Sequence, residues 1–168
     1  IVLAVVDFLP AINQLLKSGD EQAIRQYFEA LGINGVLFLI LLQAVQVMTS
    51  LIPALSLQAA AGASYGPLIG TAVILIGMVL GNGIVYLFAE RLLDQLSPQS
   101  RIAQMLDRFH HWLAGKNKEL YCFVMFLLPI LPNLVKPYLA AVSDIRWPVF
   151  LFTCAVGSII PVLAGTLI

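Results

Sequence analysis

One basic side chain lies inside an apolar, proline-rich stretch, and it has the clearest potential for chemistry in this sequence. Lys136 follows Pro132 by four residues and directly precedes Pro137. A charged group in apolar surroundings is costly and usually faces a cavity or a partner. Two interpretations stay open: the ammonium group binds an anion such as a phosphate, or the stem extends to a polar surface.

Uncharged polar side chains are embedded in equally apolar stretches. They are Gln43, Gln46, Ser56, Gln58, Ser64, Asn82, Asn133 and Ser143. Such groups form hydrogen bonds between helices or contact a ligand. Ser56, Gln58 and Asn133 are the binding candidates because they lie next to prolines. Asp144 and Arg146 end the stretch that holds Lys136, and they form either an interfacial ion pair or the rim of a cavity.

Other chemistry has no support in the sequence. His110 and His111 are adjacent and therefore point to different faces of a helix, whereas a two-histidine metal site needs a spacing of i and i+4. Cys122 and Cys154 lie in apolar stretches and resemble small buried hydrophobic residues. No nucleophile or nucleotide motif is present, and the net charge is zero. We therefore expect no enzyme, no cofactor, no metal and no nucleic-acid partner.

The composition indicates a membrane protein. Hydrophobic residues make up 60% of the 168 residues and charged ones 11%, against roughly 25% charged in a typical soluble domain. No Asp, Glu, Lys or Arg lies between Glu29 and Glu90. About 20 apolar residues cross a bilayer once. The sequence thus predicts a multi-pass integral protein of a bacterial inner or plasma membrane, or of an equivalent internal membrane.

A first repeat covers about residues 18–89. It begins with an amphipathic interfacial helix that Ser18 opens with a capping-box spacing to Glu21. An apolar arm, a proline break, a short arm and a full span follow. These four elements lie at residues 36–52, Pro53, residues 54–65 and residues 67–89.

A second repeat, at about residues 97–168, has the same elements in the same order. Its amphipathic helix begins at Ser97, and Pro129 and Pro132 break its arm. The arm, the short arm and the span lie at residues 120–131, 133–144 and 147–168. An offset of 79 residues (132 minus 53) aligns the two breaks.

Two arms that enter and return add no net crossing, so each repeat crosses the bilayer once. Successive repeats are then antiparallel, as in the inverted repeats of many transporters. Non-helical backbone at membrane depth requires protein or a wet cavity around it. We therefore predict an all-α integral membrane protein with two re-entrant helical hairpins that meet at a shared site. The chain is expected to form one membrane domain, residues 1–168, and to lack its original N-terminus because it begins with Ile1.

The basic residues predict the orientation. The polar linker 90–119 carries five of them, against Lys17 and Arg25 in the earlier polar segment. The positive-inside rule then places residues 90–119 in the cytoplasm.

The run from Pro53 to Gly70 combines a proline-led apolar arm, an Ala-Gly pair and an aromatic-Gly step. It resembles the DedA, or SNARE-associated Golgi protein (VTT-domain), family. The first signature comprises Pro53, Gly62, Gly66, Pro67, Gly77, Gly81, Asn82, Tyr86 and Arg91. The second comprises Pro129, Pro132, Tyr138, Ser143, Trp147 and Gly157, with Pro137 inside it. The resemblance covers roughly residues 35–168.

The chain departs from this family at three places, one of which is Ala141, where a glycine is usual. Phe126 to Leu128 occupy a stretch where the family commonly has an arginine, and Ser56 and Gln58 stand where the DedA branch has acidic residues. The chain is therefore more similar to the uncharacterised VTT branch than to the DedA flippases. Proton coupling through carboxylates is not implied.

The resemblance implies facing hairpins and movement of lipid or of other small solutes. We expect a flippase-like or scramblase-like protein that moves phospholipid or another anionic lipid without nucleotide hydrolysis. The alternatives are a secondary transporter of a small anion or other solute, and a membrane scaffold without transport. The expected substrate-binding residues are Lys136, Asn133, Gln58, Ser56, Tyr138, Ser143, Asp144 and Arg146. Membrane lipids are the expected partners, and the Gly77-x-x-x-Gly81 spacing allows a homodimer.

Overall fold

The computed structural model describes residues 26, 32–50, 53–95, 117–128, 133 and 135–168, and the regular elements in these ranges are all helices. The predicted all-α class is confirmed for this part of the chain. The two amphipathic helices expected from Ser18 and Ser97 lie outside the described residues, and so do Pro129 and Pro132.

The first half contains α3 (Ile33–Thr49) and α4 (Ala54–Gln95), and α4 is broken at Gly66. Gly66 has φ 78° and ψ 161°, a conformation that favours glycine, and Pro67 keeps the residue before it out of the helical region. The chain reverses direction at Gly66. The evidence is that a Cβ added to Gly70 would lie 2.7 Å from the carbonyl of Ala61, so the segments before and after Gly66 lie against each other. The predicted break between the short arm and the span is confirmed.

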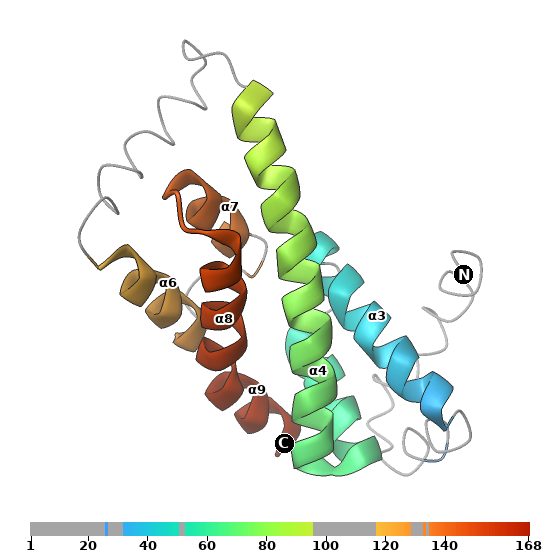
Figure 1. The fold of residues 1–168 in the computed structure, drawn as a ribbon. Coiled ribbons are helices and arrows are strands. Elements are labelled where there is room, and N and C mark those ends of the chain that lie inside the picture. The colour runs from blue at the N-terminus through green and yellow to red at the C-terminus, as the bar shows by residue number, and fades with distance from the viewer. Residues whose placement is uncertain (1–25, 27–31, 51–52, 96–116, 129–132, 134) are drawn as a thin grey trace.

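The helix α3 runs parallel to the long segment of α4, residues 67–95. A Cβ on Gly77 would lie 2.6 Å from the carbonyl oxygen of Ile40, and one on Gly81 would lie 2.8 Å from that of Ala44. The residue numbers rise together along both helices, so the arm at 54–65 runs opposite to both. In Figure 1, α3 ends beside the middle of α4. The first half is thus a helical hairpin packed against one long helix.

This contact gives a prediction for two glycines of the same helix. Gly81→Ala should destabilise the protein by about 1–3 kcal/mol, because its Cβ would press on the rigid backbone of α3. Gly83→Ala is the matched control. Its Cβ would lie 3.1 Å from the flexible end of Leu151, so the alanine should be neutral or gain up to about 1 kcal/mol of helix propensity. Thermal unfolding in detergent measures both, and equal effects would contradict the close approach of α3.

The second half contains α6 (Lys118–Leu127), α7 (Val135–Val142), α8 (Trp147–Gly157) and α9 (Ile159–Thr166). Only Ser158 separates α8 from α9, so the predicted single span consists of two consecutive helices. The Sγ of Cys122 lies 3.2 Å from the Oγ1 of Thr153, and a Cβ on Gly157 would lie 2.9 Å from the Phe123 carbonyl oxygen. The helix α6 is therefore parallel to α8, as α3 is to the long segment of α4.

The two halves pack in opposite directions. Near the start of its long segment, α4 meets the end of α9, where the hydroxyls of Thr71 and Thr166 are 2.8 Å apart. Near its other end, the Tyr86 hydroxyl donates to the main-chain carbonyl of Ile145, just before α8. The numbering thus rises along one long helix while it falls along the other. The element order is repeated with inverted direction.

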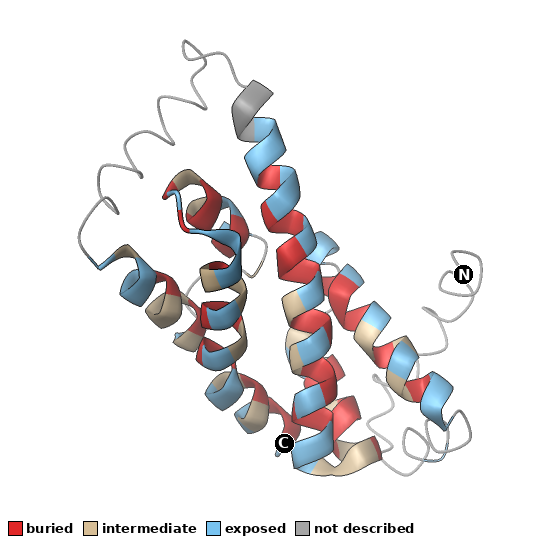
Figure 2. Ribbon diagram, viewed as in Figure 1, coloured by how far each residue is buried: buried red, intermediate tan, exposed pale blue. Residues whose placement is uncertain are grey.

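Several polar side chains are buried within the hydrophobic core of this helical assembly, and large apolar side chains are exposed on its outside. Gln43, Gln46, Asn82 and Lys136 are buried. One stripe of α3 is exposed, and it consists of Ile33, Leu37, Leu41, Val45 and Met48. Figure 2 shows the buried positions where helices face each other and the exposed positions on the outer surfaces. Two segments, Ala54–Leu92 and Trp147–Thr166, are long and apolar enough to cross a membrane.

Candidate functional site

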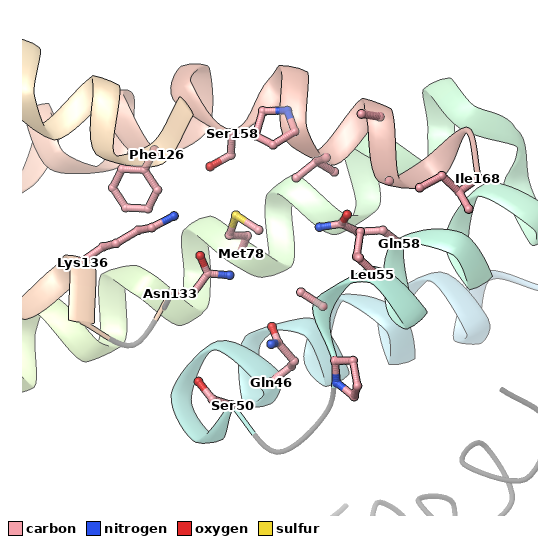
Figure 3. A pocket seen from close by; sticks show the side chains of 16 residues that line it. Gln46, Ser50, Leu55, Gln58, Met78, Phe126, Asn133, Lys136, Ser158 and Ile168 are labelled. Atoms are coloured by element: carbon pink, nitrogen blue, oxygen red, sulfur yellow. The ribbon is translucent and has the colours of Figure 1, made fainter. Parts of the chain in front are cut away.

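A pocket of about 590 Å³ is lined by α3 and α4 from the first half and by α6, α7 and α9 from the second. Gln46, Ser50 and Pro53 line it from the first hairpin, and Asn133 and Lys136 line it from the second. Pro53 and the neighbour of Pro132 thus both contribute to one cavity. Figure 3 shows Gln46, Ser50, Asn133 and Lys136 around a shared space, which Met78 of α4 also lines.

Lys136 is the cationic group of this pocket. Its side chain is 4% exposed, and its Nζ lies 5.0 Å from the centroid of the Phe126 ring. Within the described part of the chain, no carboxylate forms an ion pair with Lys136. A cation over an aromatic face is stabilised by the ring quadrupole, but the ring does not neutralise its charge. The charge of the ammonium group is therefore not neutralised by any described side chain.

Packing fixes the ring below the ammonium group. Gly157 has no side chain, and a Cβ there would lie 2.9 Å from the Cβ of Phe126. The Phe126 ring also contacts Phe150, with centroids 5.7 Å apart, and Phe150 stacks on Tyr86 at 4.8 Å. An aromatic row thus links the pocket to the contact between Tyr86 and Ile145.

Amide side chains provide the other polar groups of the pocket. Gln58 is buried, and its amide occupies the space that a Cβ on Gly165 would need. The Nε2 of Gln43 donates to the Oε1 of Gln46 at 3.0 Å, which orients the amide at the pocket wall. The Oε1 of Gln43 and the Oδ1 of Asn82 are buried without a hydrogen-bond partner among the described groups. Several amide groups are thus buried beside the hydrophobic core.

The structure brings together three of the predicted binding residues: Lys136, Asn133 and Gln58. Ser56 is half-buried and Tyr138 is exposed, and neither lines the pocket.

The remaining predicted residues lie at the turn after α7, away from the pocket lining. Ser143 donates to the carbonyl of Leu139 at 2.7 Å, while Asp144 and Arg146 are exposed. Lys118 donates to the main-chain carbonyl of Asp144 at 2.9 Å, which ties the start of α6 to this turn.

The residues of the first signature have packing roles. Gly62 lies against the carbonyl of Thr166, and Gly77 and Gly81 lie against α3. That face of α4 is therefore covered by α3 within the chain, and the homodimer stays a prediction. Asn82 donates to the carbonyl of Met78 at 2.9 Å, and Tyr86 joins the two halves. Arg91 is exposed and Pro137 is buried.

Several pocket residues were not predicted as binding groups. No sequence pattern around Ser158 or Met78 indicates a binding residue. Phe126 was identified only as part of the stretch where the family commonly has an arginine. Ser50 could have been inferred, because it directly precedes the expected break at Pro53. Among the described residues, no group of three or more His, Cys, Asp or Glu side chains could hold a metal ion.

Comparison with known proteins gives two findings. The sequence profile of the VTT domain matches residues 52–168 and so includes both sides of the pocket. The chain is similar to the uncharacterized protein YqeD of Bacillus subtilis (strain 168), with 28% identity over 150 residues, which is 88% of this chain and 71% of that protein. No solved structure matches the chain significantly.

Proposed function

Because the chain belongs to the VTT-domain (DedA) family, which commonly comprises membrane proteins, we propose that it moves anionic lipid across a bilayer. The single observation that carries this proposal is the buried Lys136 in a pocket between the two hairpins. The proposal has a membrane part and a transport part.

The distribution of side chains supports insertion into a bilayer. The exposed stripe of α3 is apolar, and the outer faces of α4 and α8 also expose large apolar residues such as Leu80, Ile84 and Phe152. Water would disfavour such continuous apolar surfaces on three helices, whereas acyl chains solvate them.

The lengths of the arms support re-entrant hairpins. The helix α3 has 17 residues, and α7 has 8, which correspond to about 25 Å and about 12 Å at 1.5 Å per residue. The hydrocarbon core is roughly 30 Å thick, so α7 cannot span it. In this arrangement the two long helices cross, and the arms enter and return. The basic residues favour a cytoplasmic linker 90–119, which a reporter fused within the linker would test.

The pocket supports an anionic cargo. A cation in a medium of low dielectric attracts a phosphate more strongly than in bulk water. The amide of Asn133, which lines the same end of the pocket, can donate a further hydrogen bond to the head group. The role proposed for the protein is thus to shelter a charged head group at the depth where the bilayer alone would exclude it.

A reconstituted assay tests this function. The purified protein is inserted into vesicles that contain a fluorescent anionic lipid on both leaflets, and a membrane-impermeant quencher reports the lipid that reaches the outer leaflet. We expect quenching of both leaflets with protein and of one leaflet without it. Vesicles that show no lipid movement but take up inorganic phosphate or another small anion would contradict the proposal and favour the solute transporter. A protein inactive in both assays would favour the scaffold.

A further inference from the structure

The pocket has a charged end and an apolar end. Lys136 and Asn133 form the charged end, as Figure 3 shows. Beyond Ser158, the wall is made by α9, which contributes Pro161, Val162 and Ala164 to the lining. The facing wall is the start of α4, with Ala54 and Leu55 and, as the polar group of this part, the amide of Gln58. An elongated, mostly apolar groove therefore continues from the charged end.

The dimensions of this groove fit an extended hydrocarbon chain. Ser158 and Ile168, which flank α9, both line the pocket, and the eight residues of α9 correspond to about 12 Å. Leu55, which lies beside Gln58 in Figure 3, is 61% exposed, so the groove opens outward there. A volume of about 590 Å³ lies within the range of pockets that enclose a small ligand, roughly 300–1,000 Å³.

We propose that the groove between α9 and the start of α4 binds a hydrocarbon chain of the ligand whose anionic head contacts Lys136. This inference rests on the proposed function and extends it, because head binding alone would leave every chain in the surrounding lipid. The ligand class is an anionic amphiphile with at least one chain that enters the protein. Charge complementarity selects it: the lining includes one cation and no carboxylate among the described residues.

A series of n-alkyl phosphates from methyl to octyl tests the inference. Their binding to the detergent-solubilised full chain is measured by equilibrium dialysis against the same detergent, with the free ligand quantified. Each methylene that enters the groove should tighten binding up to about fourfold, so octyl phosphate should bind roughly 100-fold or more tighter than methyl phosphate.

The variant Ala164→Trp distinguishes an alkyl chain that binds in the groove from one that only partitions into the detergent. Tryptophan at this lining position should fill the apolar half and abolish most of the gain with chain length, while methyl phosphate should bind as it does to the wild type. Leu163→Trp is the matched control, since Leu163 precedes Ala164 and is not among the lining residues. It should keep the wild-type dependence on chain length. Leu55→Trp places the same bulk on the opposite wall and replaces Ala164→Trp if that variant fails to fold.

The outcomes distinguish this inference from the proposed function. If Ala164→Trp and Leu55→Trp keep the full gain with chain length, the chain does not enter the groove and the inference is wrong. Methyl phosphate binding and lipid movement in vesicles would then still support the proposed function. If methyl phosphate does not bind and no lipid moves, the proposed function fails as well.

Discussion

Lys136→Met is expected to reduce the transfer of anionic lipid by about 10- to 100-fold in the vesicle assay. A hydrogen bond to a charged group contributes about 1.5–3 kcal/mol, which corresponds to that range of rates. Methionine keeps the length of the stem, and its sulfur can contact the Phe126 ring in place of the ammonium group. Packing around Phe126 should therefore be retained. Lys136→Arg should keep part of the activity, because a guanidinium also carries a charge and packs over an aromatic ring.

Lys118→Met is the matched control for this loss of charge. Lys118 is half-buried at the start of α6, away from the pocket lining, and its Nζ donates to the main-chain carbonyl of Asp144. Its substitution should leave transport near the wild-type rate, and both methionine variants should unfold at similar temperatures. Wild-type transport by Lys136→Met would mean that the lysine is only an anchor at a polar surface. The site would then rest on Gln58 and Asn133, and a zwitterionic or uncharged cargo would be favoured.

Local rules predicted much of the fold. Pro53 and the adjacent pair Gly66 and Pro67 are strong signals for helix boundaries, so the start of α4 after Pro53 and its break at Gly66 followed from residue types alone. The offset of 79 residues aligned the short arm at 54–65 with residues 133–144, where the structure has α7. The residue at which the long segment of α4 ends was less predictable. The helix α4 continues to Gln95, past the charged Glu90 at which the span was expected to end, because charge alone does not stop a helix.

The site was predicted less completely, because it depends on contacts between distant segments. Lys136, Asn133 and Gln58 were identified because each stands out in its own apolar stretch. Ser56 was grouped with them on the same ground, but its position two residues before Gln58 on a helix turns it away from the face of Gln58. Phe126 becomes relevant only when α6 and α7 are placed side by side. No local pattern specifies that register.

The inverted arrangement of the halves itself leads to a second large expected effect. Thr71→Cys combined with Thr166→Cys should form a disulfide almost completely under mild oxidation, because the two threonine hydroxyls are 2.8 Å apart. The background carries Cys122→Ser and Cys154→Ser, so that no native thiol competes. A protease site inserted between α4 and α6 lets the cross-link be read: after cleavage, the halves should stay together on a non-reducing gel and separate on reduction. The cross-link closes a loop of about 100 residues and should also raise the free energy of unfolding by roughly 3–5 kcal/mol.

The control pair for this cross-link is Thr71→Cys with Thr153→Cys. Thr153 lies 13 residues before Thr166 along the second long helix (166 minus 153), which corresponds to about 20 Å, far beyond the span of a disulfide. Parallel packing of the two long helices would instead bring the start of α4 near α8 and reverse the result. Efficient cross-linking of the pair at 71 and 153, with none at 71 and 166, would therefore contradict the inverted repeat. It would also remove the shared pocket, because the two hairpins face each other only when the halves run in opposite directions.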